Sequence, residues 1–362
     1  MFVLDSHCDT PSQILRLRDL SLDNDHAHVD FPKLRRGGVD GAFFALYVPA
    51  SLKGAEAEAY ALKLLENLRR SVSENAGTAA FACSAEDALA NKAKGLFSVF
   101  MGLENGSPIG EDIEKLMEFY NAGVRYVTLC HSADNQICDS CAPGTDTWNG
   151  LSPFGRKLVH RMNEIGMLVD VSHISDKSFY DVMKYSRVPV AATHSCCRSL
   201  ASHPRNMTDD MIRILASNDG VIQINFYPVF LDDGFRHVLA ASGLQEEGEK
   251  IEAAFIADPS DEFKRKAWYE IVDSLRGLPR PSYKRVVDHI DHAVEIAGID
   301  HVGIGSDFDG IEVTPEGLED VSKLGLVFEE MKARGYSDSD IEKVSGGNFL
   351  RLLDTVQGCK IL

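Results

Sequence analysis

Short apolar runs that end in metal-binding side chains constrain the fold of this chain more than any other feature. Apolar runs of this length, bounded by turn signals, are typical of buried strands in a parallel sheet. Polar residues at one end of many such strands are what a (β/α)8 barrel presents at its active face. The side chains at the ends of these runs are His7 with Asp9, Glu104, His131, His173, His194 and Asp307.

Strands and helices are expected to alternate along the 362 residues, 44% of which are apolar. The pattern predicts strands at 2–7, 39–48, 96–103, 124–131, 167–173, 188–194, 220–227 and 301–306. Amphipathic helices are expected at 55–72, 111–122, 153–165, 176–185, 208–216, 282–297 and 338–356. Alternation predicts a parallel sheet, and eight strands predict its closure into a (β/α)8 barrel. A (β/α)8 barrel is longer than most single domains, so a chain of this length can form one barrel. We therefore expect a single domain over residues 1–362.

Residues 228–282 interrupt this alternation between the seventh strand and its following helix, and they are highly charged. A long excursion at the active face of a barrel can serve as a lid or rim over the site. The alternative is a surface insertion without a role, and the sequence leaves both interpretations open.

Charge and cysteine content limit the classes of function. The formal net charge of −18 argues against a nucleic-acid partner, because phosphate binding needs a basic surface. No apolar run approaches the length of a membrane helix, and the start of the chain has no basic segment typical of a signal peptide. Eight cysteines scattered through a long chain suit reduced thiols better than a disulfide framework. We therefore expect a cytoplasmic protein without membrane or nucleic-acid partners.

The spacing of the polar residues favours a metal centre. His7 and Asp9 are two residues apart on a strand, so both side chains point to the same face and can hold one cation. His173 and His194 follow consecutive strands, and histidine is a common zinc ligand. Glu104 has two carboxylate oxygens that can bridge two metals, although in isolation it also fits a surface loop.

Asp307 follows the last strand, where a carboxylate can both contact a metal and exchange a proton with an attacking water molecule. Asp309 has the same side-chain direction and is not excluded by spacing alone; its alternative is a turn residue before Gly310. Three carboxylates and one bridging hydroxide balance the charge of two divalent cations. Paired cations lower the pKa of bound water and polarise a carbonyl, which is the chemistry of amide hydrolysis.

Two further residues are expected to complete the pocket. His131 is suited to donate a hydrogen bond to the substrate oxygen that gains charge. Arg205 offers a forked guanidinium that matches a carboxylate, with a salt bridge within its loop as the alternative.

At these residues the chain resembles the renal (membrane) dipeptidase family of zinc metallopeptidases, among the amidohydrolase-like barrels. The landmarks run in family order from residue 5 to residue 351 and are specific as a set. They are Asp5-Ser6-His7-Cys8-Asp9-Thr10, Gly102-Leu103-Glu104-Asn105-Gly106, Leu129-Cys130-His131-Ser132, Asp170-Val171-Ser172-His173, Ala192-Thr193-His194-Ser195, His203-Pro204-Arg205-Asn206, Gly305-Ser306-Asp307-Phe308-Asp309-Gly310 and Gly346-Gly347-Asn348-Phe349-Leu350-Arg351.

The resemblance implies a dipeptidase with two Zn²⁺ per chain. One zinc is expected on His7, Asp9 and Asp307, the other on His173 and His194, with Glu104 bridging and a hydroxide between the ions. Asp307 then also moves the proton, His131 contacts the scissile carbonyl, and Arg205 binds the C-terminal carboxylate of the dipeptide. The family often tolerates a D-residue at the C-terminal position and suggests a homodimer. The chain resembles the microbial, soluble branch.

Other interpretations remain open. A related amidohydrolase acting on a lactone, a cyclic amide or an N-acyl amino acid would share the metal ligands and differ around Arg205. A catalytically silent scaffold would have lost a ligand, and none is missing. Cys138-x-x-Cys141 fits a zinc knuckle or a redox pair, but loop cysteines are the simpler interpretation. We interpret Cys196 and Cys197 as structural thiols next to His194, with tuning of the second metal as the alternative.

Overall fold

Eight parallel strands form the central sheet. The structure, a computed structural model, describes residues 1–142, 144 and 146–361. The strands follow one another in the order β1 (Leu4–Cys8), β2 (Gly41–Tyr47), β4 (Phe97–Glu104), β5 (Val124–Thr128), β6 (Leu168–Asp170), β7 (Ala191–Ser195), β8 (Val221–Ile224) and β9 (Val302–Ile304). All eight expected strands are present. The sequence did not predict β3 (Ala79–Phe81), which pairs with β4 off this path and is too short to show an alternating pattern.

The sheet closes on itself where β1 meets the segment after β9. The backbone N–H of Asp307 donates to the carbonyl of His7 (3.0 Å), and that of Asp9 donates to the carbonyl of Phe308 (2.9 Å). The buried carboxylate of Asp5 accepts the backbone N–H of Ser306 (2.9 Å) and its hydroxyl as well. These contacts complete the predicted (β/α)8 barrel.

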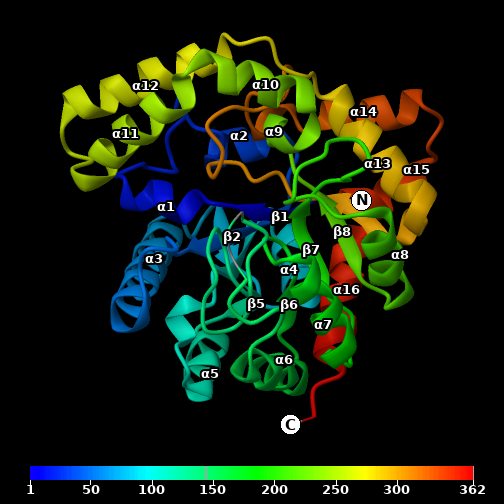
Figure 1. Cartoon of the computed structure of the whole chain (residues 1–362). Coiled ribbons are helices and arrows are strands. Elements are labelled where there is room, and N and C mark those ends of the chain that lie inside the picture. The colour runs from blue at the N-terminus through cyan, green and yellow to red at the C-terminus, as the bar shows by residue number, and fades with distance from the viewer. Residues whose placement is uncertain (143, 145, 362) are drawn as a thin grey trace.

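Helices pack around the outside of the barrel, and α1 and α2 lie at one end of it (Figure 1). They are α1 (Thr10–Leu15), α2 (Phe31–Arg36), α3 (Gly54–Glu74), α4 (Ala85–Ala93), α5 (Ile113–Asn121), α6 (Pro153–Ile165), α7 (Asp176–Tyr185), α8 (Asp209–Ser217), α13 (Lys284–Ala297), α14 (Gly325–Ala333), α15 (Asp338–Glu342) and α16 (Asn348–Gly358). The sequence pattern did not predict α1, α2, α4 or α14. Among the described residues, no helix is long and apolar enough to cross a membrane.

The helix expected over 338–356 is interrupted instead of continuous. A π-type turn, Lys343–Gly347, separates α15 from α16. A Cβ atom on Gly346 would lie 2.6 Å from the carbonyl oxygen of Phe2, so only glycine lets this turn approach the start of β1 so closely. The close approach, which hydrophobic spacing does not reveal, therefore divides the helix.

The expected insertion folds into helices at the end of the barrel where α1 begins (Figure 1). They are α9 (Pro228–Leu231), α10 (Asp233–Ser242), α11 (Leu244–Ala257) and α12 (Glu262–Arg276). A small cluster of buried side chains that includes Phe255 and Trp268 holds α11 against α12. An ion pair between Arg16 and Glu252 (2.9 Å) ties α11 to the segment after α1. The organisation as a single domain stays a prediction.

Candidate metal centre and active cavity

The six predicted ligands converge at the carboxyl ends of the strands. Three groups of side chains each offer ligand atoms within 4.8 Å of one another. The groups are His7 with Glu104 and His194, Glu104 with His131 and His173, and His7 with Asp9 and Asp307. Side chains from β1, β4, β7 and the segments after β5, β6 and β9 thus meet in one place, as expected at the active face of a barrel.

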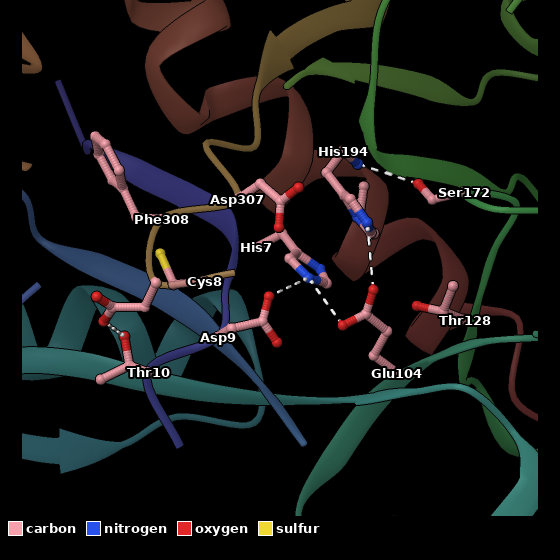
Figure 2. Close-up of polar contacts among 12 residues, drawn as sticks. His7, Cys8, Asp9, Thr10, Glu104, Thr128, Ser172, His194, Asp307 and Phe308 are labelled. Atoms are coloured by element: carbon pink, nitrogen blue, oxygen red, sulfur yellow. Dashed lines mark hydrogen bonds and ion pairs between the residues drawn. The ribbon is translucent and has the colours of Figure 1, made fainter. Parts of the chain in front are cut away.

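Glu104, the last residue of β4, lies at the centre of this cluster (Figure 2). Its Oε2 is 3.3 Å from His7 Nε2. Its Oε1 is 3.1 Å from His173 Nε2 and 3.4 Å from His194 Nε2. The two oxygens of one buried carboxylate therefore face two different sets of histidine nitrogens, which is the arrangement of a bridging ligand.

Neighbouring side chains set the tautomer of His194. Thr193 donates its hydroxyl hydrogen to Asp170 (2.7 Å), so the Thr193 oxygen is free to accept the Nδ1–H of His194 (2.8 Å). In the neutral ring, Nε2 then carries the lone pair. Asp170 also accepts hydrogen bonds from Thr128 (2.6 Å) and the backbone of Ser172 (3.0 Å). These hydrogen bonds fix the orientation of the His194 ring and hold its Nε2 toward Glu104.

His7 is oriented in the same way by Tyr126. The phenol oxygen lies 2.8 Å from His7 Nδ1 and leaves Nε2 to face Asp9 (3.5 Å) and Glu104. The ring of Tyr126 reaches this position by crossing Gly102, where a Cβ atom would lie 2.1 Å from the ring. Glycine at position 102 is therefore required for the close approach.

The cluster concentrates carboxylates in a buried site, and this shifts their pKa values. Burial, and then Glu104, raises the pKa of Asp9 to about 6. Burial, with Asp9 adding to it, raises the pKa of Asp307 to about 7. Burial lowers the pKa of His7, but the charges and hydrogen bonds of Glu104 and Asp9 together outweigh burial and raise the pKa well above its ordinary value. Carboxylates crowded in this way are destabilised as anions unless positive charge joins them.

The residues fit divalent metal ions. Two buried atoms, His7 Nε2 and Asp9 Oδ1, have no hydrogen-bond partner. Burial lowers the pKa of both His173 and His194 well below the ordinary value, so the rings are neutral and able to act as ligands. Their Nε2 atoms lie 2.9 Å apart and both face Glu104. Neutral imidazoles combined with carboxylates form a donor set that suits zinc and other transition metals.

Asp307 and Asp309 have different partners. Spacing alone had left Asp309 as a second candidate ligand beside Asp307. Asp307 Oδ2 accepts a hydrogen bond from Asn225 (2.8 Å) beside the cluster. The carboxylate of Asp309 instead accepts from Arg18 (2.6 Å) and Thr10 (2.9 Å). Both aspartates have left-handed backbone conformations, with φ of 65° and 68°, so the turn reverses the simple alternation that spacing assumes.

His131 and His173 lie on loops and not on strands, because β5 ends at Thr128 and β6 ends at Asp170. The expected strands 124–131 and 167–173 are therefore too long. His173 has a left-handed φ of 70°, which no strand residue adopts. Burial, and then the charge of Arg205, lowers the pKa of His131 to about 3, so this ring is neutral.

Arg205 lies in the cavity wall and is 5% exposed. It donates to Ser195 Oγ (2.8 Å) and to the carbonyl of His194 (2.7 Å), whereas its Nε has no partner. In the part of the chain that the structure describes, no carboxylate lies within ion-pair distance of Arg205, so the alternative of a loop salt bridge is wrong. A buried guanidinium without an anion is ready to bind one.

Four of the six candidate ligands line a cavity of about 690 Å³, together with His131, Arg205 and Tyr227. The four are Asp9, Glu104, His173 and Asp307. Arg236, Glu252 and Ile256 of the insertion line it as well, so this segment forms part of its rim. Movement of the insertion as a lid stays a prediction.

Sequence reasoning missed the residues that orient the ligands, which are Tyr126, Asp170, Thr193 and Asn225. Asn225 had a usable signal, because it follows strand β8 as a polar residue, like the ligands that follow other strands. The other three look like ordinary strand residues until their neighbours are known.

The cysteines have structural surroundings. Cys196 donates to the carbonyl of Asn225 (3.2 Å), and Cys197 to the carbonyl of His289 (3.4 Å). Burial raises the pKa of Cys196 to about 12, which disfavours the thiolate that binds metals. Cys138 is buried and Cys141 lines the active cavity; neither belongs to a metal-binding group among the described residues.

The fold and the site together define a class of protein. A (β/α)8 barrel with histidines and carboxylates clustered at its strand ends, beside a buried arginine, has the features of a metal-dependent hydrolase of the amidohydrolase-like type. The chain belongs to the membrane dipeptidase family (peptidase family M19), whose model matches residues 1–361. It is therefore a metallodipeptidase, a hydrolase that acts on dipeptides.

Individual relatives agree with this assignment. The chain is 32% identical to the dipeptidase verJ of Clonostachys rogersoniana over 91% of this chain and 76% of the relative. It superposes on the probable dipeptidase PvdM of Pseudomonas aeruginosa with a TM-score of 0.82 and 28% identity, covering 99% and 96% of the two chains. A metallopeptidase of Rhodobacter sphaeroides, liganded with a phosphinate mimic of L-Ala-D-Ala, matches with a TM-score of 0.81 and 26% identity, covering 98% and 99%.

Proposed function

We propose that this protein hydrolyses dipeptides that have a free C-terminal carboxylate, with two Zn²⁺ ions held by the six clustered ligands. The observation that carries the proposal is the convergence of three ligand groups beside Arg205, a buried arginine without a carboxylate partner among the described residues. His7, Asp9 and Asp307 would hold one ion, His173 and His194 would hold the other, and the two oxygens of Glu104 would serve both. When bound, the two ions supply a water molecule of lowered pKa and a polarised substrate carbonyl.

The residues around this centre divide the remaining tasks. Asp307 takes the proton from the attacking water at its carboxylate and passes it to the leaving amine. Asn225 supports this role by holding Oδ2 of Asp307 with one hydrogen bond (2.8 Å). His131, neutral and 3.9 Å from Glu104, donates a hydrogen bond to the carbonyl oxygen as that oxygen gains charge.

Arg205 accounts for the preference for dipeptides. A carboxylate bound to Arg205, which is anchored to the carbonyl of His194, is held close to the ligands themselves. This fixed distance leaves room for one residue beyond the cleaved bond. The L-Ala-D-Ala mimic in the Rhodobacter sphaeroides relative supports the proposal that a C-terminal D-residue is accepted here too.

A panel of four substrates tests the proposal on zinc-loaded protein, with a chelated control. The panel is an L-L dipeptide, an L-D dipeptide, a tripeptide and a C-terminally amidated dipeptide. We expect hydrolysis of the two dipeptides alone and loss of activity on chelation. Hydrolysis of the amidated dipeptide at the same rate would contradict the role of the carboxylate, and silence on every dipeptide would move the assignment to another amidohydrolase substrate.

We also propose a homodimer in a reducing, cytoplasmic compartment. The eight cysteines are all free thiols, which supports the compartment. The family resemblance supports the dimer. Sedimentation of the metal-loaded protein tests the oligomeric state, and a mass near one chain would contradict it.

A further inference from the structure

A second cavity of about 320 Å³ adjoins the active cavity and has no role in the chemistry above. It lies between the segment after α1 and the helices α11 and α12, which Figure 1 shows side by side above α1. The two cavities share a wall made of Arg16, Glu252 and residues 309–312. A group that extends from a substrate across this wall would enter the second cavity.

Two hydrogen-bond donors face each other in this cavity. The backbone N–H of Asp309 donates to His28 Nδ1 (3.0 Å), so Nδ1 is an acceptor. His28 is 5% exposed, and burial lowers its pKa to about 3, so the ring is neutral and its single hydrogen must lie on Nε2. The neighbour of Nε2 is Nη2 of Arg276, at 3.5 Å, which also has only hydrogens to offer. The contact is therefore between two donors, and an acceptor is missing.

Among the described residues, Arg276 has only a loose ion pair. Its nearest carboxylate, Asp273, is 3.8 Å away and 59% exposed, and its buried Nε has no hydrogen-bond partner. Burial lowers the pKa of Arg276, and the nearby carboxylates of Asp273, Glu319 and Asp320 act against this shift without cancelling it. A single water molecule would accept from both donors but would leave the charge of Arg276 only partly compensated, whereas an anion satisfies both requirements.

The acidic residues of the cavity are already engaged. Asp309 is bound to Arg18 and Thr10, and Glu252 is bound to Arg16. Asp19 accepts hydrogen bonds from Ser21. Glu312 also lines the cavity; burial raises its pKa to about 7, and its side chain is hydrogen-bonded to Tyr227. An acceptor for His28 and Arg276 must therefore come from outside this set. Trp268, and Tyr269 stacked on His26 at 4.1 Å, add flat apolar walls that suit the methylene groups of a side chain.

We propose that His28 and Arg276 form a subsite for the carboxylate of an acidic side chain on the N-terminal residue of the substrate. The assignment rests on the proposed dipeptidase function, which places the N-terminal residue on the side of the metal centre opposite Arg205. Acidic dipeptides are thus the preferred substrate class. A small carboxylate molecule that is not part of a dipeptide would bind the same two donors. The test therefore distinguishes a substrate side chain from such a molecule.

The test compares kcat/KM for L-Glu-Ala with that for its neutral isostere L-Gln-Ala, using the C-terminal stereochemistry that the panel selects. We expect the wild type to prefer L-Glu-Ala by roughly tenfold or more, the range for hydrogen bonds to charged groups. Arg276→Gln abolishes this preference, and Arg276→Lys keeps part of it. Lys266→Gln is the matched control, because Lys266 lies on the same helix, carries the same charge and is 76% exposed. It leaves the preference unchanged.

Calorimetry of glutarate binding to the metal-loaded wild type and Arg276→Gln provides the second measurement. Weaker glutarate binding in the variant, without any preference for L-Glu-Ala, would assign the site to a free carboxylate and overturn the substrate assignment. Equal binding and no preference would mean that water satisfies the donors. If no dipeptide is hydrolysed, the proposed function fails, and calorimetry alone still decides whether the two donors bind an anion.

Discussion

Replacement of Arg205 by alanine tests how the site selects its substrate. Arg205 is 5% exposed, has no carboxylate partner among the described residues, and has an Nε without a hydrogen-bond partner. The variant removes the positive charge while the ligands of the metal centre keep their own contacts to Thr193 and Tyr126. We therefore expect KM to rise strongly while the metal content stays near two ions per chain.

The size of the effect follows from the hydrogen bonds between buried Arg205 and the C-terminal carboxylate of the substrate. A hydrogen bond to a charged group contributes about 1.5–3 kcal/mol, which corresponds to roughly 10- to 150-fold in kcat/KM. The assay measures kcat/KM for a dipeptide and for its C-terminal amide in both proteins. The wild type should discriminate between the two by this factor, and Arg205→Ala should treat them alike, because the amide has no charge for the arginine to bind.

Arg236→Ala is the matched control, because Arg236 also lines the cavity but is 32% exposed and paired with Asp233 (2.9 Å). An exposed pair of this kind contributes little, so kcat/KM should change by less than about fivefold. An unchanged KM in Arg205→Ala, or persistent discrimination against the amide, would refute the reasoning.

Three further predictions concern the ligands and their supports. Asp307→Asn should lower kcat by about 10²–10⁴-fold, the usual contribution of a general base, with little loss of folding; full activity would exclude the proton transfer. Tyr126→Phe removes the partner of His7 Nδ1 and should weaken metal affinity by about 10–100-fold in competition with a chelator; unchanged affinity would contradict an orienting role. The third prediction uses the pKa of Asp307, which burial raises to about 7 in the absence of metal. A carboxyl group with a raised pKa stabilises the fold at low pH, and this contribution is lost as the pH rises through the folded value. In chelated protein, the unfolding free energy of the wild type should therefore fall relative to Asp307→Asn by up to about 1.4 kcal/mol per pH unit between pH 5 and 7. Urea unfolding at pH 5, 6 and 7 measures this difference, and parallel curves would contradict it.

The barrel and the clustering of most candidate ligands were predictable because both follow from local patterns. A buried parallel strand appears as a short apolar run, and a polar residue that ends such a run marks the active face. This rule located His7, Glu104 and His194 on the strands themselves. It also located Asp307, which lies in the loop just after β9 and so stays close to the end of that strand.

Local patterns failed where a distant segment decides the conformation. The break before α16 exists because Gly346 approaches Phe2, which lies at the other end of the chain. Spacing likewise left Asp309 as a candidate ligand, and only the contact with Arg18 assigns it elsewhere. In both cases the deciding partner is more than 290 residues away in the sequence.

The sequence by itself thus determined the fold class, the face that carries the site and the chemistry of its ligands, because each is written in residue types and short spacings. Tertiary structure alone decided how the ligands are oriented, through Tyr126, Thr193 and Asn225. It also brought His28 and Arg276, 248 residues apart, to face each other as two donors. Hydrogen-bond geometry depends on how strands and loops pack in space, and no local spacing encodes it.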